Sequence, residues 1–552
     1  MNILLTTINS KYIHQNLAIR LLYELNKNYE KLFWKEFINK DNLDEIAAYC
    51  SNYQIIAFSC YIWNISKILE VSKKIKEINP EIKILLGGPE VSYDWNDIIE
   101  LKYIDFIIYG EGEIPFKLFL NSYPNIENVP NLVWKKNNEI IENKCAEVFD
   151  LKNLISINPY INDSTEELKS KITYIEASRG CPYKCGFCIA GLDNNVRYLA
   201  IESIQSNLLY LFEKAKIIKF LDRTFNSNTE FAIQILGFIL KNYEKDNIFQ
   251  FEIKADTPQP KLIEYIKLNV PKGVFRFEIG IQTLNPKANK EIKRSQNFEN
   301  IKFFIQQISD KIEIHLDLIV GLPFDYYNDI KFSFDEVFKL FAPELQLGFL
   351  KFLKGTPIRN HYIKHDYIFD NKPPYQIIES NYLSKSEIQK ITLAEQILEI
   401  YWNKKRTVNT LKYISLSYSI FDFFIDLGIY FEKQNEFKKF DIIEIYTIIF
   451  EYSKLNLHEN VIILQLIAID FYLQHKIKPS IRFLSEIDKP SKNKIIEKYQ
   501  LNHHKFRYIM IPINFNFKKF VHKNIIKFSD ELIIFQYDGI NKPKIKFIKN
   551  FK

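Results

Sequence analysis

The sequence predicts an α/β protein in which a doubly wound (Rossmann-like) domain precedes a partial barrel of parallel strands and a mainly helical region. Short apolar runs alternate with amphipathic stretches through residues 1–120 and again from Ile172 to Pro357, as expected of βαβ units. After Pro373-Pro374 the apolar residues follow a helical period instead. A chain of 552 residues also exceeds one hydrophobic core, so about two to four domains are expected.

The first 120 residues carry the signals of a parallel sheet with ligand-binding loops. Four apolar runs predict buried strands, namely Ile3–Ile8, Ile55–Ser59, Ile82–Leu86 and Phe106–Tyr109, and helical patterns cover Leu17–Leu25 and Ile65–Ile78. The last two runs are followed by Gly87-Gly88 and by Gly110-Glu111-Gly112. Glycine lets the backbone approach a ligand closely at the carboxyl edge of such a sheet. These loops suit a large flat cofactor or a nucleotide.

We predict four segments: a doubly wound domain (1–125), a linker (126–170) with a hairpin around Val133–Ile141, a barrel (171–370) and a C-terminal region (371–552). Six barrel strands are predicted, at Tyr174–Ala177, Ile217–Leu221, Phe249–Ile253, Val274–Ile279, Glu313–Ile319 and Leu345–Phe352. A closed eightfold barrel needs about 250 residues. An incomplete (β/α)6 barrel therefore fits better.

The C-terminal region is predicted to be helical at Ser386–Tyr401 and Tyr413–Tyr430 and to end in strands at Phe506–Ile513 and Leu532–Tyr537. From Lys489 onward, 15 Lys and Arg residues stand against 4 Asp and Glu residues, whereas the whole chain has a net charge of +7. A basic end can contact RNA or another polyanion. The alternative is a solvated surface in a lysine-rich protein.

Three of the six cysteines, Cys181, Cys185 and Cys188, form the pattern Cys-x₃-Cys-x₂-Cys just after the first predicted barrel strand. Barrel active sites gather at that end of the strands. Cubane iron–sulfur clusters are normally held by four cysteine thiolates, so three clustered ligands leave one iron open to a small molecule. A zinc site is the alternative, but zinc ligands usually come as paired Cys-x₂-Cys units or as cysteine with histidine.

The residues around these cysteines fit a cluster loop. Gly180 and Gly186 would let the chain wrap closely around the cluster. Arg179 and Lys184 would offset the negative charge of thiolates and sulfides.

With Phe187 just before the last cysteine, this motif resembles that of the radical S-adenosylmethionine (SAM) superfamily. The resemblance implies a [4Fe–4S] cluster whose open iron is chelated by SAM, and reductive cleavage of SAM to a 5′-deoxyadenosyl radical. Four later segments agree with that family in order: Phe220–Asn226 with Asp222, Arg276–Thr283 with Glu278 and Gln282, Asp317–Pro323 with Asp317 and Gly321, and Leu350–Pro357. The resemblance implies that the first three segments contact SAM and that Leu350–Pro357 forms the last strand of the core.

The first domain resembles the cobalamin-binding domain of cobalamin-dependent radical SAM proteins, through Gly87, Gly88, Gly110, Glu111 and Gly112. It lacks the Asp-x-His-x-x-Gly motif that supplies a histidine below the cobalt. The corresponding stretch reads Tyr-Ile-His-Gln-Asn-Leu around His14, so His14 is not expected to bind cobalt. Asn9–His14 and Pro373–Tyr375 further resemble an uncharacterised bacterial subfamily that ends in a domain of unknown function.

The resemblance implies an enzyme that generates the deoxyadenosyl radical, uses cobalamin and methylates an unactivated carbon. A cobalamin-independent radical rearrangement or RNA modification is the alternative reaction, and a non-catalytic iron–sulfur electron-transfer protein is the alternative class. The expected partners are an electron donor such as flavodoxin or ferredoxin and a small-molecule or RNA substrate. Met1–Thr7 lacks the pattern of a signal peptide, and no run approaches about 18 apolar residues, so a cytoplasmic protein without a membrane partner is expected.

Overall fold

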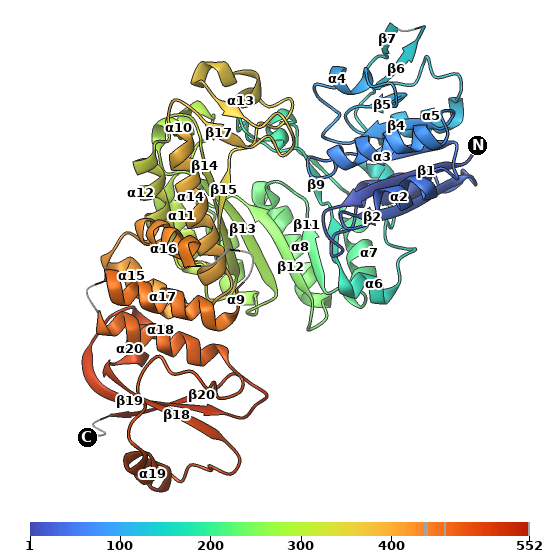
Figure 1. Ribbon diagram of the computed structural model, residues 1–552. Helices are drawn as coiled ribbons and strands as arrows, with labels where there is room; N and C mark the ends of the chain where they lie inside the picture. The colour runs from blue at the N-terminus through green and yellow to red at the C-terminus, as the bar shows by residue number, and fades with distance from the viewer. Residues whose placement is uncertain (138, 435–436, 438–439, 458–459, 550–552) are drawn as a thin grey trace. The chain divides into compact units, whose positions relative to one another are not determined.

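The computed structural model describes residues 1–549 except 138, 435–436, 438–439 and 458–459 (Figure 1). It divides into two compact units. The first unit comprises Met1–His315, Gly321–Asp325 and Phe349–Tyr382, and the second comprises Leu316–Val320, Tyr326–Gly348 and Leu383–Lys552. The predicted α/β class with a helical C-terminal region is confirmed.

The N-terminal sheet has the strand order β2-β1-β3-β4-β5-β6-β7. Its parallel strands are β1 (Ile3–Asn9), β2 (Leu32–Ile38), β3 (Ile55–Ser59), β4 (Lys83–Gly87) and β5 (Phe106–Ile108). The connecting helices are α1 (Leu17–Leu25), α2 (Leu43–Cys50), α3 (Ile65–Ile78), α4 (Asn96–Ile99) and α5 (Glu113–Ser122). Alternate residues of β1 enter two separate cores, Leu4 with Val71 of α3 and Ile3 with Phe116 of α5, as a doubly wound domain requires.

Two features of this sheet differ from the expectation. Strand β2 was not predicted, because Lys35 and Glu36 interrupt its apolar residues and only Leu32 and Phe37 of the seven are buried. The expected linker hairpin, β6 (Leu132–Lys136) and β7 (Glu139–Glu142), pairs antiparallel with β5 and so extends the N-terminal sheet. Val133 and Leu132 bury their side chains in the two cores, which fixes the hairpin there.

The second sheet has the order β15-β14-β13-β12-β11-β8, which confirms a partial barrel. Its strands are β8 (Ile172–Ile175), β11 (Ile217–Phe220), β12 (Ile248–Ile253), β13 (Phe275–Gln282), β14 (Glu313–Val320) and β15 (Glu344–Phe349). The main connecting helices are α7 (Ile201–Phe212), α8 (Thr229–Asn242), α9 (Pro260–Asn269), α10 (Pro286–Glu291), α11 (Phe298–Ile308) and α12 (Tyr327–Phe338). Burial alternates along β12 and β13, so polar residues such as Glu278 line the face opposite the buried phenylalanines.

The C-terminal region is helical and then β-rich, as predicted. It contains α14 (Lys385–Ile397), α15 (Val408–Ser417), α16 (Ile420–Gln434), α17 (Ile442–Asn456), α18 (Val461–Gln474), α19 (Lys489–Lys498) and α20 (Phe517–Lys523), with antiparallel strands β18 (Arg507–Phe515), β19 (Phe528–Tyr537) and β20 (Lys544–Lys549). The expected helix Tyr413–Tyr430 is two helices. The Ser419 hydroxyl accepts a hydrogen bond from Asp422 N (3.1 Å) and starts α16 anew. Among the residues described, no helix has both the length and the apolar character needed to cross a membrane.

A buried carboxyl joins two of these helices and should make stability depend on pH. Asp470 of α18 accepts hydrogen bonds from Asn409 Nδ2 (2.6 Å), Thr410 N (2.9 Å) and Thr410 Oγ1 (2.8 Å) at the start of α15. Burial raises the pKa of Asp470 to about 6, despite these donors. An unfolded aspartate has a pKa of about 3.9, so between these values the folded chain binds more protons than the unfolded chain. Stability from this group is therefore lost as pH rises from about 4 to 6.

We expect the Asp470→Asn variant to lack this component of the pH dependence, because asparagine keeps an acceptor for Thr410 and does not titrate. The melting temperature of wild type minus that of the variant should fall by a few degrees between pH 4.5 and 7. Thermal unfolding followed by circular dichroism at these pH values measures the difference. A difference that does not change with pH would contradict the assignment.

Candidate functional site

The three motif cysteines lie in a loop that is closed at its base. Strand β9 (Ser178–Arg179) pairs antiparallel with β10 (Arg197–Tyr198), and the loop between them carries the cysteines. Inside the loop, Cys181 N donates to Asp193 O (2.9 Å). Gly180 has a φ of +87°, and a Cβ there would lie 2.4 Å from Asn195 O, so only glycine fits this crossing without a shift.

The cysteine side chains are largely shielded from solvent and form no disulfide with one another. Cys181 and Cys185 are each 9% exposed, Cys188 is half-buried, and all three are free thiols. Within the described part of the chain, no three His, Cys, Asp or Glu residues converge tightly enough to hold a single metal ion. A cubane cluster makes a different demand, because each cysteine binds a separate iron. The three free thiols of the loop are the donor set of a cluster that keeps one open iron.

Two side chains from outside the cysteine loop lie near the cysteine sulfurs. Thr224 Oγ1, just after β11, lies 3.6 Å from Cys181 Sγ, and Arg294 Nη1 lies 3.7 Å from Cys185 Sγ. Arg294 Nε is fixed by Gln296 Oε1 (3.2 Å). Hydrogen bonds and positive charge beside the sulfurs are what a cluster loop needs. Sequence reasoning missed Arg294, because 106 or more residues separate it from the motif and no local pattern marks it.

Arg179 was expected to offset the negative charge of a cluster, but its own charge is already paired with carboxylates. Its guanidinium forms ion pairs with Glu113 (2.8 Å), Glu176 (3.1 Å) and Glu111 (3.3 Å). Burial lowers the pKa of Arg179, but the three carboxylates outweigh it and raise the pKa above its ordinary value. Arg197 also pairs with Glu111 (2.6 Å). The two arginines thus tie the base of the cluster loop to the start of α5 in the N-terminal domain.

Asp222, predicted as a SAM contact, holds the strand that leads into the cluster loop. Its two oxygens accept hydrogen bonds from Ala177 N (2.9 Å) and Ser178 Oγ (2.5 Å). The side chain is 2% exposed, and burial raises its pKa to about 7. Both oxygens are therefore occupied by the chain itself.

Glu278 and Gln282 lie on β13, on the polar face of the barrel sheet. Glu278 pairs with Lys219 Nζ (2.9 Å), and although burial raises the pKa of Glu278, the Lys219 charge outweighs it and leaves the pKa low. Gln282 has a φ of +70°, and its Oε1 is buried without a hydrogen-bond partner in the described chain. A buried acceptor left unpaired is costly, so this atom fits a ligand that donates a hydrogen bond.

Gly321 and Asp317, the two residues singled out in the segment Asp317–Pro323, have surroundings that do not by themselves indicate a ligand. Gly321 has a φ of +96°, a backbone conformation that favours glycine, and a Cβ there would also lie 2.6 Å from Ile377 Cδ1. Its carbonyl accepts a hydrogen bond from Tyr367 OH (2.8 Å). Asp317 is a half-buried residue of β14.

The N-terminal sheet has its strand-order reversal between β1 and β3, where doubly wound domains bind ligands. Asn64 braces this point, since its Nδ2 donates to Thr7 Oγ1 (3.1 Å), Ile8 O (3.2 Å) and Ser59 O (3.1 Å). The ring of Trp63, 49% exposed, stacks on Tyr61 with centroids 4.4 Å apart. An exposed aromatic surface at this edge suits a large flat cofactor.

The predicted glycine loops lie at the same edge. Gly88 has a φ of +103°, and a Cβ there would lie 2.6 Å from Cys60 O, so the loops after β3 and β4 touch through backbone. Gly87 O accepts from Cys60 N (2.7 Å), Gly110 (φ +71°) donates to Ser92 Oγ (3.0 Å), and Gly112 precedes α5. Glu111 between them is held by the two arginines described above.

The loop after β4 also contacts the segment that follows the barrel. The buried Glu90 accepts a hydrogen bond from Tyr375 OH and lies 3.8 Å from Lys354 Nζ. A Cβ on Gly355 would lie 2.4 Å from Cγ of Tyr93. Burial raises the pKa of Glu90 and lowers that of Lys354. The two motifs that sequence reasoning singled out separately, Gly87–Glu90 and Pro373–Tyr375, are thus brought together.

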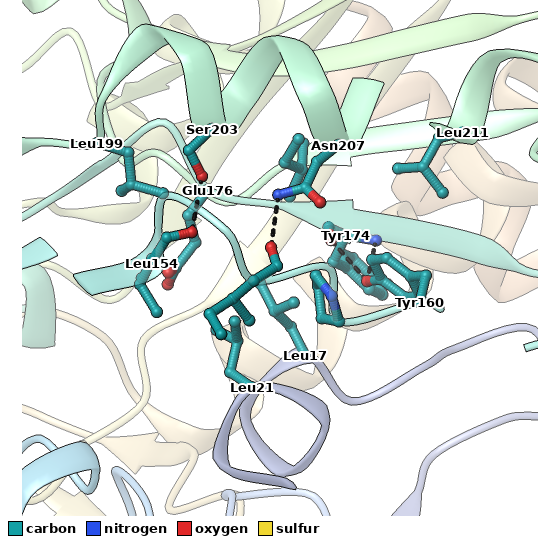
Figure 2. Close-up of a pocket in the computed structure, with 13 residues that line it drawn as sticks. Leu17, Leu21, Leu154, Tyr160, Tyr174, Glu176, Leu199, Ser203, Asn207 and Leu211 are labelled. Carbon is teal, nitrogen blue, oxygen red and sulfur yellow. Dashed lines mark hydrogen bonds between the residues drawn. The ribbon is translucent and has the colours of Figure 1, made fainter. Parts of the chain in front are cut away.

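The cavity shown in Figure 2 is not a cofactor site. It lies between α1, β8 and α7, lined by Leu17, Leu21, Tyr174 and Leu211 among others, and its volume of about 20 Å³ is that of a single water. Hydrogen bonds from Ser203 Oγ to Leu154 O (3.0 Å) and from Asn207 Nδ2 to Ile157 O (3.1 Å) close its wall. Nearby, His14 Nδ1 lies 2.6 Å from Tyr174 OH, which gives that ring a structural partner.

Three protein families match successive parts of the chain. Residues 6–120 match the B12 binding domain, residues 175–337 the radical SAM superfamily, and residues 363–544 a protein of unknown function, DUF4080. These matches confirm the predicted family resemblance. The matching domain families also confirm the predicted cofactor set of a [4Fe–4S] cluster, SAM and cobalamin.

Curated relatives match over part of their length. The cobalamin-dependent radical SAM methyltransferase TokK of Streptomyces tokunonensis is 29% identical over 148 residues, which cover 24% of this chain and 21% of TokK. An uncharacterized methyltransferase of Pyrococcus horikoshii is 24% identical over 304 residues, 52% of this chain and 63% of that relative. The chain thus spans less than two thirds of each of these relatives.

A solved structure shares the fold across most of the chain. The cobalamin-dependent S-adenosylmethionine radical enzyme OxsB, with aqua-cobalamin bound, superposes with a TM-score of 0.60 at 15% identity, over 85% of this chain and 79% of OxsB. At this identity the likeness concerns the fold.

Proposed function

Because this chain carries a B12 binding domain, a radical SAM domain and a DUF4080 domain, we propose that it is a cobalamin-dependent radical SAM enzyme that methylates an unactivated carbon. The observation that carries the proposal is the three-cysteine loop after β8, tied by Arg179 and Arg197 to the glycine-lined edge of the N-terminal domain. Methyl transfer needs a radical source and a methyl carrier side by side. The ion pairs join the two loops that would hold them.

Within this proposal Cys181, Cys185 and Cys188 hold the [4Fe–4S] cluster. A cluster held there would supply the electron for reductive cleavage of SAM, and a bound cobalamin would supply methyl-transfer chemistry. Asp222 keeps the entry strand of the loop in place through Ala177 N and Ser178 Oγ. The guanidinium of Arg294 stabilises the charge on the Cys185 thiolate.

The SAM pocket is proposed on the polar face of the barrel sheet. There Gln282 Oε1 is buried and has no hydrogen-bond donor among the described residues. The amino group of the SAM methionine moiety is such a donor. Glu278, held ionised by Lys219, adds negative charge on the same face. Gly321 at the end of β14 completes the proposed set.

The cobalamin site is proposed at the edge formed by Gly87, Gly88, Gly110, Glu111 and Gly112. The backbones of the two loops meet directly at Gly88 and Cys60, where glycine allows a flat ring to approach closely. We propose binding without a histidine from the chain on the cobalt, since the stretch around His14 lacks the Asp-x-His-x-x-Gly motif.

The radical chemistry requires a one-electron reductant, and we propose a flavodoxin or ferredoxin as its source. The substrate is proposed to be a small molecule with an unactivated carbon, and RNA is the alternative because of the basic C-terminal end.

The test is anaerobic expression with cobalamin supplied, followed by iron, sulfide and corrinoid analysis and by assay of SAM cleavage with a chemical reductant. About four irons and one cobalt per chain, with 5′-deoxyadenosine formed, support the proposal. Iron without cobalt would replace it by a cobalamin-independent rearrangement or RNA modification. No iron would reject the radical SAM assignment.

Substitution of Gln282 by methionine should separate stability from SAM binding. The unfolding transition should stay unchanged or rise, because an unpaired buried acceptor is removed, whereas SAM affinity should fall about tenfold through loss of one hydrogen bond. Thermal unfolding without cofactor and equilibrium binding of SAM to the reconstituted protein measure the two effects. The matched control is Gln306→Met on the exposed side of α11, which should change neither. Unaltered SAM affinity in the Gln282 variant would remove this residue from the site.

A further inference from the structure

An exposed basic face surrounds the outer side of the cluster loop. It is defined by Lys184 of the loop, Lys290 and Lys293 at the end of α10, and Lys364 beyond the barrel, all four exposed. We propose that this cluster-loop basic face docks an acidic protein that carries one electron at low potential, and so supplies the reductant that the proposed function requires.

Backbone hydrogen bonds bring the segments of this face together. Gly186 N donates to Ile292 O (2.8 Å), and Ile358 N donates to Gly186 O (3.0 Å). Lys184 precedes Gly186 by two residues, and Lys290 and Lys293 flank Ile292 in the chain. The Lys364 ammonium contacts Glu291, which places the fourth cation beside the same crossing.

The face lies close to the sulfurs as well as to solvent. Arg294, adjacent in sequence to Lys293, points Nη1 at Cys185 Sγ over 3.7 Å. Gly186 itself follows Cys185 directly. Electron transfer slows steeply with distance, so a carrier seated on this face would deliver its electron near the shortest path through the protein to the cluster.

The charge of the face is cancelled only in part by nearby acids. The half-buried Glu291 is the acidic residue next to these lysines, and it already pairs with Lys364 and with His365 Nε2 (3.2 Å). Asp366 is exposed and accepts a hydrogen bond from Asn381 Nδ2 (2.6 Å). The excess of positive charge would raise the association rate of an acidic partner.

An apolar patch borders the cations and favours a protein partner over RNA. Ile363 is 72% exposed and Tyr362 is 38% exposed, directly before Lys364. A few apolar contacts ringed by charges are typical of small, transient redox interfaces. RNA would gain from the cations but not from an aliphatic side chain such as Ile363.

This inference rests on the proposed function, because it presumes a cluster in the loop. The step is a single electron passed from the reduced carrier, which is thereby oxidised, to the oxidised [4Fe–4S] cluster, which is thereby reduced. No bond forms or breaks at this step, and no proton is transferred.

The test uses the full-length reconstituted protein and a reduced acidic flavodoxin as the probe. The variant is Lys290→Glu with Lys293→Glu, and the matched control is Lys544→Glu with Lys546→Glu on the exposed side of β20. We expect the first variant to slow cluster reduction by flavodoxin about tenfold and to weaken flavodoxin binding to the protein, whereas the control should leave both unchanged. Added salt should slow the wild type but have little effect on the variant.

Cluster reduction is followed by electron paramagnetic resonance, and dithionite serves as the small reductant. Equal reduction of wild type and variant by dithionite, with slow reduction of the variant by flavodoxin, supports the docking face. Equal rates with flavodoxin would overturn it. Failure of dithionite to reduce any cluster in the wild type would instead reject the proposed function. If the variant loses binding of single-stranded RNA while its rate with flavodoxin is unchanged, the face is an RNA surface and the inference is wrong.

Discussion

Replacing Cys185 by alanine is expected to lower bound iron from about four atoms per chain to less than one after anaerobic reconstitution. Three thiolates already leave one of the four irons without a protein ligand. Removal of Cys185 would leave a second iron without one, so the cluster should be held too weakly to survive desalting. Formation of 5′-deoxyadenosine from SAM should fall below detection. Iron and sulfide analysis and the charge-transfer absorption of the cluster measure the effect.

The control for this variant is Cys145→Ala. Cys145 is the exposed cysteine outside the loop, near Tyr109 OH (3.4 Å), and its removal should leave iron content unchanged. Retention of full iron in the Cys185 variant, or equal loss in both variants, would contradict the assignment of the cluster ligands.

Replacing Gly88 by alanine is expected to destabilise the N-terminal domain by about 2–5 kcal/mol and to abolish cobalamin retention. The φ of +103° costs an alanine about 1–3 kcal/mol, and its Cβ would stand 2.6 Å from Cys60 O, so the backbone must also shift. That shift opens the loop crossing on which the proposed corrin site is built. Thermal unfolding and corrinoid content after gel filtration measure the two effects.

Gly273→Ala separates conformational strain from steric clash. Gly273 has a φ of +92°, but no atom of the described residues lies within 4 Å of a Cβ placed there, so its variant should lose only about 1–2 kcal/mol and keep its cobalamin. Similar losses of stability and cobalamin in both variants would show that the contact with Cys60 is not what requires glycine at position 88.

The regular elements of the two sheets could be predicted because burial follows a simple period in them. The barrel strands are short apolar runs, and β13 alternates buried and half-buried residues along its length. Two elements were predicted wrongly or missed, because their residues do not follow a simple period of burial. The edge strand β2 has mostly half-buried residues, and the helix expected at Tyr413–Tyr430 is interrupted by the capping hydroxyl of Ser419, which sequence periodicity does not register.

The candidate site could be predicted where its chemistry is local in sequence. The spacing of Cys181, Cys185 and Cys188 on one loop follows from the sequence, because ligands within eight residues need no knowledge of the fold. The partners of Arg179 could not be predicted in this way. Glu111 and Glu113 lie 68 and 66 residues away in the chain, and only the docking of α5 against β9 brings them to it.

Strand period, glycine positions and cysteine spacing are short-range properties, so they predict the two sheets, the loops at their carboxyl edges and the proposed class of chemistry. The pairing of charges with these loops depends on the tertiary structure. That structure assigned Arg294 to Cys185, Asp222 to the entry strand, Arg179 to the N-terminal domain and Glu90 to Tyr375. A charged side chain pairs with whatever packing places within a few ångströms of it, and that distance is set by the fold and not by separation along the chain.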